Sequence, residues 1–400
     1  MNQFSQDVLT YYDKHKRDLP WREVNNPYYT WLSEIMLQQT RVEAVKEYFA
    51  RFTRELPTID DLANADEELL LKLWEGLGYY SRVRNLQKAA RQIMENYEGK
   101  LPEEKAELLS LAGIGDYTAA AIASICYGKK EVALDGNLIR VFSRLFAQAE
   151  DFSKQVAKRE LIRKIEELMP EDRAGDFNQA MMDIGATICI PNGRPLCESC
   201  PVRTHCKAFE DGNMLSYPLK KEKKARKIEQ KTLFLLHRDG NGKSEILLRK
   251  RKGKGVLMGL WEFPSAEGHL NMREVREAVE NEILEMEYQI IDIKELPPAR
   301  HIFSHLEWDM KAYYIVLKLR EEIMAGKIAE ERALVRERIN NTDTSKEIGV
   351  SEEKSLYNPE EIVDNEITEI GIWASKKQIA EELSLPSAFK SYQTILFQSL

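Results

Sequence analysis

The sequence predicts a multidomain protein, with an all-α region up to about residue 217 followed by a smaller α+β domain. Its 400 residues suffice for two or three domains, and 43% hydrophobic with 31% charged residues is typical of a globular protein. From Ser5 to Glu98 apolar residues recur every three or four positions, with breaks at Pro20, Pro27 and Pro57. After Tyr217 this helical period gives way to short apolar runs typical of strands.

The net charge of −8 argues weakly against nucleic acid as a partner, since a DNA-binding protein is expected to carry a basic face. The charge is unevenly distributed, however, with acidic residues gathered between 352 and 369 and a basic run from Lys220 to Lys231. The first ten residues have no secretion signal, and no apolar run is long enough to span a bilayer. We expect a cytoplasmic monomer without a membrane partner.

A glycine turn organises the all-α region. Gly113 and Gly115 allow a turn that directs backbone N–H groups toward the start of a helix near Asp116, where a phosphate of a DNA backbone would bind. Asp135 precedes another helix with an apolar period, so a carboxylate is expected beside this turn. The alternatives are an ordinary turn and an aspartate that only caps its helix.

Glu34 lies in a predicted helical segment from Tyr28 to Phe49. Glu34 and Gln38 fall at the edge of its apolar stripe, which is formed by Trp31, Ile35, Val42, Val45 and Phe49. One interpretation is an acid whose pKa is raised by partial burial, so that it holds a proton near neutral pH. In the other, the carboxylate reaches solvent or pairs with Arg41.

A second glycine turn spans residues 76–84, with paired aromatic residues and two arginines. It is either a loop between core helices or a wedge that stacks on bases. In the second case, Arg82 and Arg84 are expected to contact phosphates.

Four of the five cysteines form an array from residue 189 to 206. Seven, two and five residues separate Cys189, Cys197, Cys200 and Cys206. In a chain without a secretion signal, this spacing indicates a metal site, and four thiolates can hold zinc or a [4Fe-4S] cluster. The spacing alone does not separate the two. We expect the fifth cysteine, Cys126, to be a small buried apolar residue.

Six features together resemble the MutY adenine DNA glycosylases of the helix-hairpin-helix, endonuclease III-like superfamily. These are Leu19–Arg22, Trp31–Thr40, Gly76–Tyr80, Leu134–Asn137, Phe177–Asp183 and the cysteine array. The resemblance is dense over residues 1–217 and thinner beyond. It implies a helix-hairpin-helix glycosylase domain whose loop 189–206 holds a [4Fe-4S] cluster. One residue more than the family's usual number separates Cys189 from Cys197.

The resemblance also implies roles for individual residues. Glu34 would protonate the adenine as the general acid, and Asp135, oriented by Asn137, would stabilise the cationic sugar or a covalent intermediate. A phenol at Tyr117 could support this cation. The adenine must leave the base stack to react. Trp21, Arg22 and Gln179 would surround the extruded base, Gln39 and Tyr79 would fill the gap, and Thr40 and Leu77 would also contact the DNA.

The same resemblance extends to a Nudix-like domain over residues 232–400, after a basic linker at 218–231. Gly259–Pro264 is the matching segment. Residues 276–281 contain only part of the glutamate array that a Nudix hydrolase needs, so this domain is expected to bind and not to hydrolyse.

Arg300–His305 matches the loop that reads 8-oxoguanine, with Phe303, Ser304 and His305 as the recognition residues. Without the resemblance, this segment would be a strand end with two surface histidines. A charged insertion from about 321 to 364 is either a partner-docking arm or a solvated excursion before the last strand.

The sequence therefore predicts a monofunctional glycosylase that removes adenine opposite 8-oxoguanine, or opposite G, from double-stranded DNA of the nucleoid. One alternative is a bifunctional, endonuclease III-like glycosylase and lyase, which needs an amine nucleophile where this chain has Tyr117. The other is a catalytically silent DNA-binding protein, which the presence of both Glu34 and Asp135 opposes.

Overall fold

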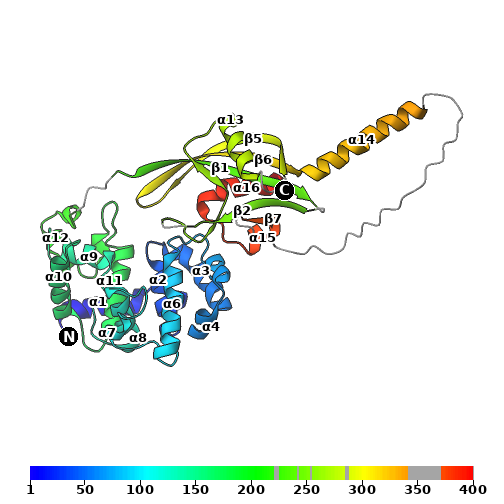
Figure 1. The fold of residues 1–400 in the computed structure, drawn as a ribbon. Helices are drawn as coiled ribbons and strands as arrows, with labels where there is room; N and C mark the ends of the chain where they lie inside the picture. The colour runs from blue at the N-terminus through cyan, green and yellow to red at the C-terminus, as the bar shows by residue number, and fades with distance from the viewer. Residues whose placement is uncertain (220–224, 241–242, 253–254, 284–287, 341–370, 400) are drawn as a thin grey trace. The chain divides into compact units, whose positions relative to one another are not determined.

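The computed structural model describes residues 1–219, 225–240, 243–252, 255–283, 288–340 and 371–399 (Figure 1). The chain divides into two compact units, Met1–Lys223 and Lys224–Leu400, and each is treated by itself. The first unit is helical, and the second contains a mixed β-sheet with helices. The predicted fold class, all-α followed by α+β, is confirmed.

The helical unit begins with α1 (Gln3–His15) and η1 (Pro20–Arg22). The helices that follow are α2 (Pro27–Leu37), α3 (Val42–Glu55), α4 (Ile59–Asn64), α5 (Glu67–Leu73), α6 (Ser81–Asn96), α7 (Lys105–Leu108), α8 (Asp116–Tyr127), α9 (Gly136–Leu145), α10 (Gln155–Leu168) and α11 (Ala174–Thr187). Short turns complete it: η2 (Cys197–Ser199), η3 (Arg203–His205), α12 (Lys207–Glu210) and η4 (Met214–Ser216).

Helix α8 lies between two groups of helices, because it packs against α2 and against α11. Its alanines, Ala119 to Ala123 with Ile122 among them, are fully buried and leave room for a close helix crossing. Gly175 of α11 meets this helix so closely that a Cβ there would lie 2.6 Å from the carbonyl oxygen of Ser124. Helix α11 also packs against α1 and α9. These contacts bring residues of α2, α8, α9 and α11 around one space.

The second unit is built on strands β1 (Lys227–Gly240), β2 (Lys243–Lys250), β3 (Trp261–Glu262), β4 (Ser265–Glu267), β5 (Tyr288–Ile302), β6 (Leu306–Leu319) and β7 (Ile372–Ser375). The strand order is β3-β2-β1-β6-β5, with β4 paired to β1 and β7 paired to β2. Strands β1 and β6 run parallel, whereas β5 and β6 form an antiparallel hairpin. The helices are α13 (Met272–Ile283), α14 (Arg320–Asn340), α15 (Lys376–Glu381), η6 (Ser387–Phe389) and α16 (Lys390–Ser399).

The two faces of this sheet belong to two different cores. Leu233 and Leu235 of β1 join the core that includes residues of α15, η6 and α16, such as Phe389. Phe234 and Leu236 join the core that contains Val275 and Val279 of α13. Successive side chains of a strand point to opposite faces, so a sheet covered on both sides needs this continuous apolar run.

The structure corrects one predicted boundary. Strand β1 begins at Lys227, so the second half of the predicted linker at 218–231 belongs to the sheet. Lys227 to Lys231 pair with residues 306–310 of β6. The basic run looked like a linker because polar residues at the start of a strand carry no apolar alternation. Helix α14 covers the first part of the predicted insertion at 321–364, and residues 341–370 lie outside the described residues.

Among the described residues, no helix combines the length and apolar character needed to cross a membrane.

Candidate active site

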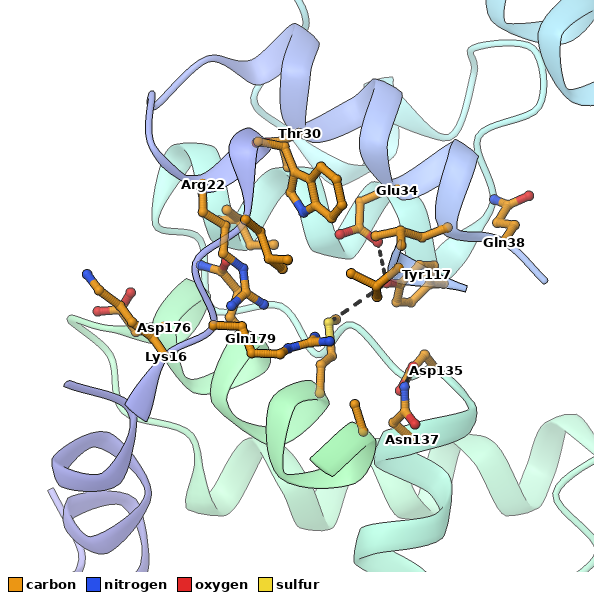
Figure 2. Close-up of a pocket in the computed structure, with 18 of the residues that line it drawn as sticks. Lys16, Arg22, Thr30, Glu34, Gln38, Tyr117, Asp135, Asn137, Asp176 and Gln179 are labelled. Carbon is orange, nitrogen blue, oxygen red and sulfur yellow. Dashed lines mark hydrogen bonds between the residues drawn. The ribbon is translucent and has the colours of Figure 1, made fainter. Parts of the chain in front are cut away.

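One cavity of about 1160 Å³ in the helical unit is lined by the predicted catalytic and base-binding residues (Figure 2). They come from η1, α2, α8, α9 and α11, and they are Trp21, Arg22, Glu34, Tyr117, Asp135, Asn137 and Gln179. Gln38, Gln39 and Thr40, at the end of α2, also line it. Residues separated by up to 158 positions therefore share one space large enough for a nucleoside.

Glu34 is held inside α2 with only 6% of its surface exposed. The hydroxyl of Tyr117, in the first part of α8, donates a hydrogen bond to Oε2 of Glu34. Burial raises the pKa of Glu34 to about 6, and the negative charge of Asp135 acts in the same direction, while the bond from Tyr117 and the charge of Arg22 oppose the rise. Glu34 thus pairs with Tyr117 and is protonated in part near neutral pH.

Asp135 is the N-cap of α9 and also faces the cavity. Its Oδ1 accepts the backbone N–H of Leu138 at 2.7 Å, and its Oδ2 accepts the amide N–H of Asn137 at 2.7 Å. Burial raises the pKa of Asp135 above its ordinary value, and these two hydrogen bonds limit the rise by favouring the carboxylate. The sequence presented a helix cap and a carboxylate at the site as alternatives, and in the structure Asp135 both caps α9 and lines the cavity.

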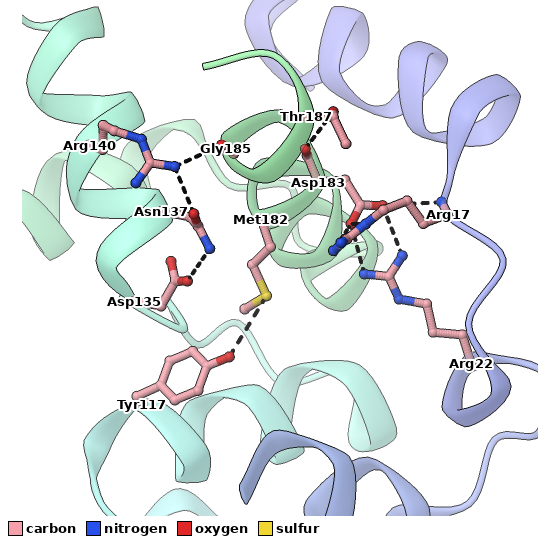
Figure 3. Close-up of polar contacts among 10 residues, drawn as sticks. All are labelled: Arg17, Arg22, Tyr117, Asp135, Asn137, Arg140, Met182, Asp183, Gly185 and Thr187. Carbon is pink, nitrogen blue, oxygen red and sulfur yellow. Dashed lines mark hydrogen bonds and ion pairs between the residues drawn. The ribbon is translucent and has the colours of Figure 1, made fainter. Parts of the chain in front are cut away.

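A buried arginine, Arg140, connects Asn137 to the cysteine segment, and Figure 3 shows its contacts with Asn137 and Gly185. Arg140 donates from Nη2 to Oδ1 of Asn137 at 2.7 Å and to the carbonyl of Gly185 at 2.7 Å, and from Nε to the carbonyl of Cys189 at 2.7 Å. A Cβ at Gly185 would lie 2.6 Å from the Cβ of Asn137, so this contact needs glycine. Asp135 is therefore joined to the backbone of Cys189 through two side chains.

Arg22 is oriented by Asp183, a buried carboxylate on α11 (Figure 3). Nη1 of Arg22 lies 2.8 Å from Oδ2 of Asp183, and Nη2 of Arg17 lies 2.6 Å from Oδ1. Sequence reasoning assigned no role to Asp183 or Arg140. The available signal was a charged residue within an apolar run, such as Asp183 between Met182 and Ile184, because a buried charge needs a partner.

The two predicted gap-filling residues have left-handed backbone conformations. Gln39, with φ of 60°, follows the C-cap of α2, and Tyr79, with φ of 48°, lies in the second glycine turn and is 44% exposed. Such conformations are uncommon outside glycine and occur often at functional sites. Gly113, with φ of 77°, and Gly115, the N-cap of α8, form the predicted exposed turn before Asp116.

The second glycine turn differs from its prediction at Arg82. Leu77 is 7% exposed, so its side chain faces the core in this structure, and its predicted contact with DNA stays a prediction. Arg82 donates to five backbone carbonyls inside the unit, and the predicted phosphate contact is wrong for this residue. Arg84 forms an ion pair with Glu67 at 2.8 Å. Local sequence could not show that carbonyls from two segments meet at Arg82.

The four cysteines of the array line one small cavity beside α9. Burial raises the pKa of the thiols of Cys197 and Cys206, and that of Cys200 to about 12. Nη1 of Arg144 lies 3.1 Å from Sγ of Cys189. Among the described residues, no three His, Cys, Asp or Glu side chains are placed to ligate one ion.

In the second unit, Ser304 and His305 form the exposed tip of the β5–β6 hairpin. The N–H of Phe303 donates to the carbonyl of Leu306 at 2.8 Å and closes the turn. The Phe303 ring packs edge-on against Trp308, with ring centroids 4.9 Å apart. The Phe303 ring is therefore anchored in the core of this unit. In α13, Glu277 and Glu280 pair with arginines on their own helix.

Comparison with known proteins covers both units. A family model described as HhH-GPD superfamily base excision DNA repair protein matches residues 32–168, and a NUDIX domain model matches residues 233–392. A solved structure described as a thermostable thymine-DNA glycosylase is 30% identical, with a TM-score of 0.48 over 52% of this chain and 95% of that one.

Three relatives carry the same description, adenine DNA glycosylase. The protein of Rattus norvegicus is 34% identical over 79% of this chain and 70% of its own length, and that of Homo sapiens is 34% identical over 79% and 67%. The protein of Buchnera aphidicola subsp. Baizongia pistaciae is 37% identical over 65% of this chain and 73% of its own length. At this identity and coverage the resemblance that the motifs predicted is confirmed, and the chain belongs to the adenine DNA glycosylase family.

Proposed function

We propose that this protein removes adenine paired with 8-oxoguanine, or with G, from double-stranded DNA by hydrolysis of the N-glycosidic bond. The observation that carries the proposal is the pair of carboxyl groups in one cavity. Glu34 has a pKa of about 6 and is protonated in part near neutral pH, whereas Asp135 accepts two hydrogen bonds that favour its ionised form. Cleavage of a glycosidic bond needs one acid and one carboxylate.

The proposed reaction divides between these two groups. The bond between the sugar C1′ and the base nitrogen breaks, its electron pair stays with the adenine, and Glu34 gives its proton to the base. The carboxylate of Asp135 faces the positive charge that develops on the sugar. A water molecule then adds to C1′ and returns a proton to Glu34. The products are free adenine and an abasic strand that remains intact.

The surroundings of the pair favour hydrolysis over lyase chemistry. A lyase needs an amine near C1′ that can form a Schiff base. Tyr117 stands next to Glu34 instead, and its phenol cannot form one. Lys16 and Lys158 also line the cavity, and Figure 2 shows Lys16 beside Asp176, at the end away from Asp135. We therefore expect a strand that is nicked only after added alkali.

The adenine reaches this cavity only after it leaves the base stack. Gln39 and Tyr79 are the candidates to fill the space that it leaves, because both are exposed at tight turns of the helical unit. The turn at Gly113 and Gly115 offers backbone N–H groups to a phosphate. Trp21, Arg22 and Gln179 would surround the extruded base.

Recognition of 8-oxoguanine is assigned to the tip of the β5–β6 hairpin. This base differs from guanine by an oxygen on C8 and a proton on N7, so a reader needs both a donor and an acceptor. The hydroxyl of Ser304 can supply both, and it is exposed at the tip. His305, whose Nδ1 lies 3.2 Å from Oγ of Ser304, would orient that hydroxyl.

Cys189, Cys197, Cys200 and Cys206 would hold a [4Fe-4S] cluster. A single zinc ion requires four sulfurs about 2.3 Å from one centre, whereas a cluster binds each sulfur through a different iron. The four thiols line one cavity and supply the four sulfur ligands that either group needs, and the resemblance to the MutY family favours the cluster. The cluster would fix the segment that contacts Arg140 and Arg144. Metal analysis of protein prepared without oxygen tests this: iron and broad absorbance in the visible range are expected, and zinc without iron contradicts it.

Release of the base tests the proposed function. Full-length protein in excess is incubated with duplexes that contain A opposite 8-oxoguanine, A opposite T, or thymine glycol, and free base and alkali-labile strand are measured. We expect rapid release of adenine from the first duplex alone. Cleavage of the thymine-glycol strand, or high-yield trapping of the protein on DNA by borohydride, would favour the bifunctional alternative. Binding without release would favour the silent one.

A further inference from the structure

Arg82 is a half-buried cation that the proposed chemistry does not use. It lies at the start of α6, and burial lowers its pKa to about 10, so it remains charged at neutral pH. Its Nη1 donates to the carbonyls of Ile35 at 2.7 Å, Met36 at 3.1 Å and Gln38 at 2.7 Å. Its Nη2 donates to the carbonyls of Leu77 at 3.0 Å and Gly78 at 3.1 Å.

These carbonyls come from two segments far apart in the sequence. Ile35 and Met36 lie in the last turn of α2, where carbonyls have no partner within the helix and a positive charge is favourable. Leu77 and Gly78 belong to the second glycine turn. One planar guanidinium therefore joins the end of α2 to this turn.

Two of the contacts fix the peptide planes that precede the gap-filling residues. The carbonyl of Gln38 belongs to the peptide bond that leads into Gln39, and the carbonyl of Gly78 to the one that leads into Tyr79. Both residues then adopt the left-handed conformation, with φ of 60° and 48°. Such a conformation persists only where the surrounding contacts hold it. The Tyr79 ring also lies over the cation, 5.7 Å from ring centroid to Cζ of Arg82.

We propose that Arg82 is a positioning residue that holds Gln39 and Tyr79 together in the conformation that opens the duplex. This inference rests on the proposed function, because it assigns these two residues to the space left by the adenine. Arginine suits the role because its fork of donors is rigid, whereas lysine has one nitrogen and cannot span both segments in the same geometry. Arg82 touches neither the base nor the sugar in this account.

The test compares Arg82→Met and Arg82→Lys with Arg91→Met in the full-length protein. Arg91 is a matched control: it is another arginine of α6, and its Nε donates to the carbonyl of Ala63 at 2.9 Å, away from both turns. Three properties are measured: thermal melting, the single-turnover rate on A opposite 8-oxoguanine, and the fluorescence of 2-aminopurine placed next to the target adenine. The fluorescence rises when that base is unstacked, and it does not depend on base release.

We expect Arg82→Met to lower the rate at least tenfold and to lose most of the fluorescence rise at saturating protein. Arg82→Lys is expected to lie between it and wild type, and Arg91→Met to behave as wild type. The alkaline limb of the pH profile should stay in place in every variant, because Glu34 is not moved. If Arg82→Met does not fold, the inference is tested by comparing the rate and fluorescence of Arg82→Lys with those of the wild type.

Three outcomes would overturn the inference. Wild-type rate and fluorescence in a folded Arg82 variant would show that Gln39 and Tyr79 keep their conformation without Arg82. A slower rate with a shifted pH profile and a full fluorescence rise would mean that Arg82 acts on the pKa of Glu34, through the end of α2. Failure of both variants to fold would leave it a purely structural residue. In contrast, a wild-type protein that releases no adenine would contradict the proposed function itself.

Discussion

The cavity of the helical unit and the hairpin tip of the second unit place their functional groups in opposite environments. Glu34 is almost fully buried, and Tyr117, Asp135 and Arg22 all affect its pKa. Ser304 and His305 are exposed, and only the Phe303 ring is anchored, against Trp308. Proton transfer near neutral pH needs a carboxyl group removed from water, whereas recognition of a base in DNA needs polar groups that reach out to it. Substitutions in the cavity should therefore lower the reaction rate, whereas substitutions at the hairpin tip should change the choice of substrate.

The largest effect is expected from the two carboxyl groups. Glu34→Gln and Asp135→Asn keep the shape of each side chain but remove the transferable proton or the charge, so each should lower the single-turnover rate about a thousandfold or more. Binding to a lesion duplex should be retained, as a gel-shift titration would show. A variant of either residue that cleaves at nearly the wild-type rate would remove that residue from the mechanism.

The next largest effect is the dependence of the rate on pH. Glu34 acts in its protonated form and has a pKa of about 6, so the rate should fall as pH rises through 6, roughly fiftyfold between pH 6 and pH 8. The bond from Tyr117 stabilises the carboxylate and lowers this pKa. Tyr117→Phe should therefore move the alkaline limb to higher pH, whatever happens to the maximum rate. An alkaline limb that stays in place would mean that another group titrates.

The free energy of unfolding should depend on pH because the carboxyl group of Glu34 is buried. Its pKa is raised in the folded protein, so the carboxylate destabilises the fold above pH 6, and this penalty disappears as pH falls below the value of about 4.5 in the unfolded chain. Glu34→Gln should therefore raise the free energy of unfolding by about 2 kcal/mol at pH 8. Thermal melting at pH 8 and pH 4 measures this. Equal gains at both values would exclude the charge as the cause.

The smallest effect is expected at the hairpin. Phe303→Ala together with Ser304→Ala should lower the preference for A opposite 8-oxoguanine over A opposite G by roughly tenfold, the worth of one set of base contacts. Slow release of A opposite G should persist, because the cavity is untouched. Ser391→Ala, at an exposed serine of α16, is the control. If the ratio of the two single-turnover rates is unchanged, lesion choice resides in the helical unit.

Local sequence was sufficient to predict the secondary-structure elements and to identify most of the residues around the cavity. The apolar periods predicted the helices, the change after Tyr217 predicted the α+β unit, and the motifs named Glu34, Asp135 and Tyr117. It failed where a residue's environment was decided by distant segments. Lys227 to Lys231 became a strand because β6 lies beside them, and Arg82 turned inward because carbonyls from two segments meet there.

The sequence by itself determined which chemical groups the site contains and which family the chain resembles, because motifs, cysteine spacing and helix signals are local properties of the chain. Only the tertiary structure decided how acidic those groups are and what holds them. The pKa of Glu34 depends on its burial and on Tyr117, Asp135 and Arg22, and the orientation of Arg22 depends on Asp183, 161 positions away. Desolvation and charge–charge interactions act through space, so they exist only after the helices have packed.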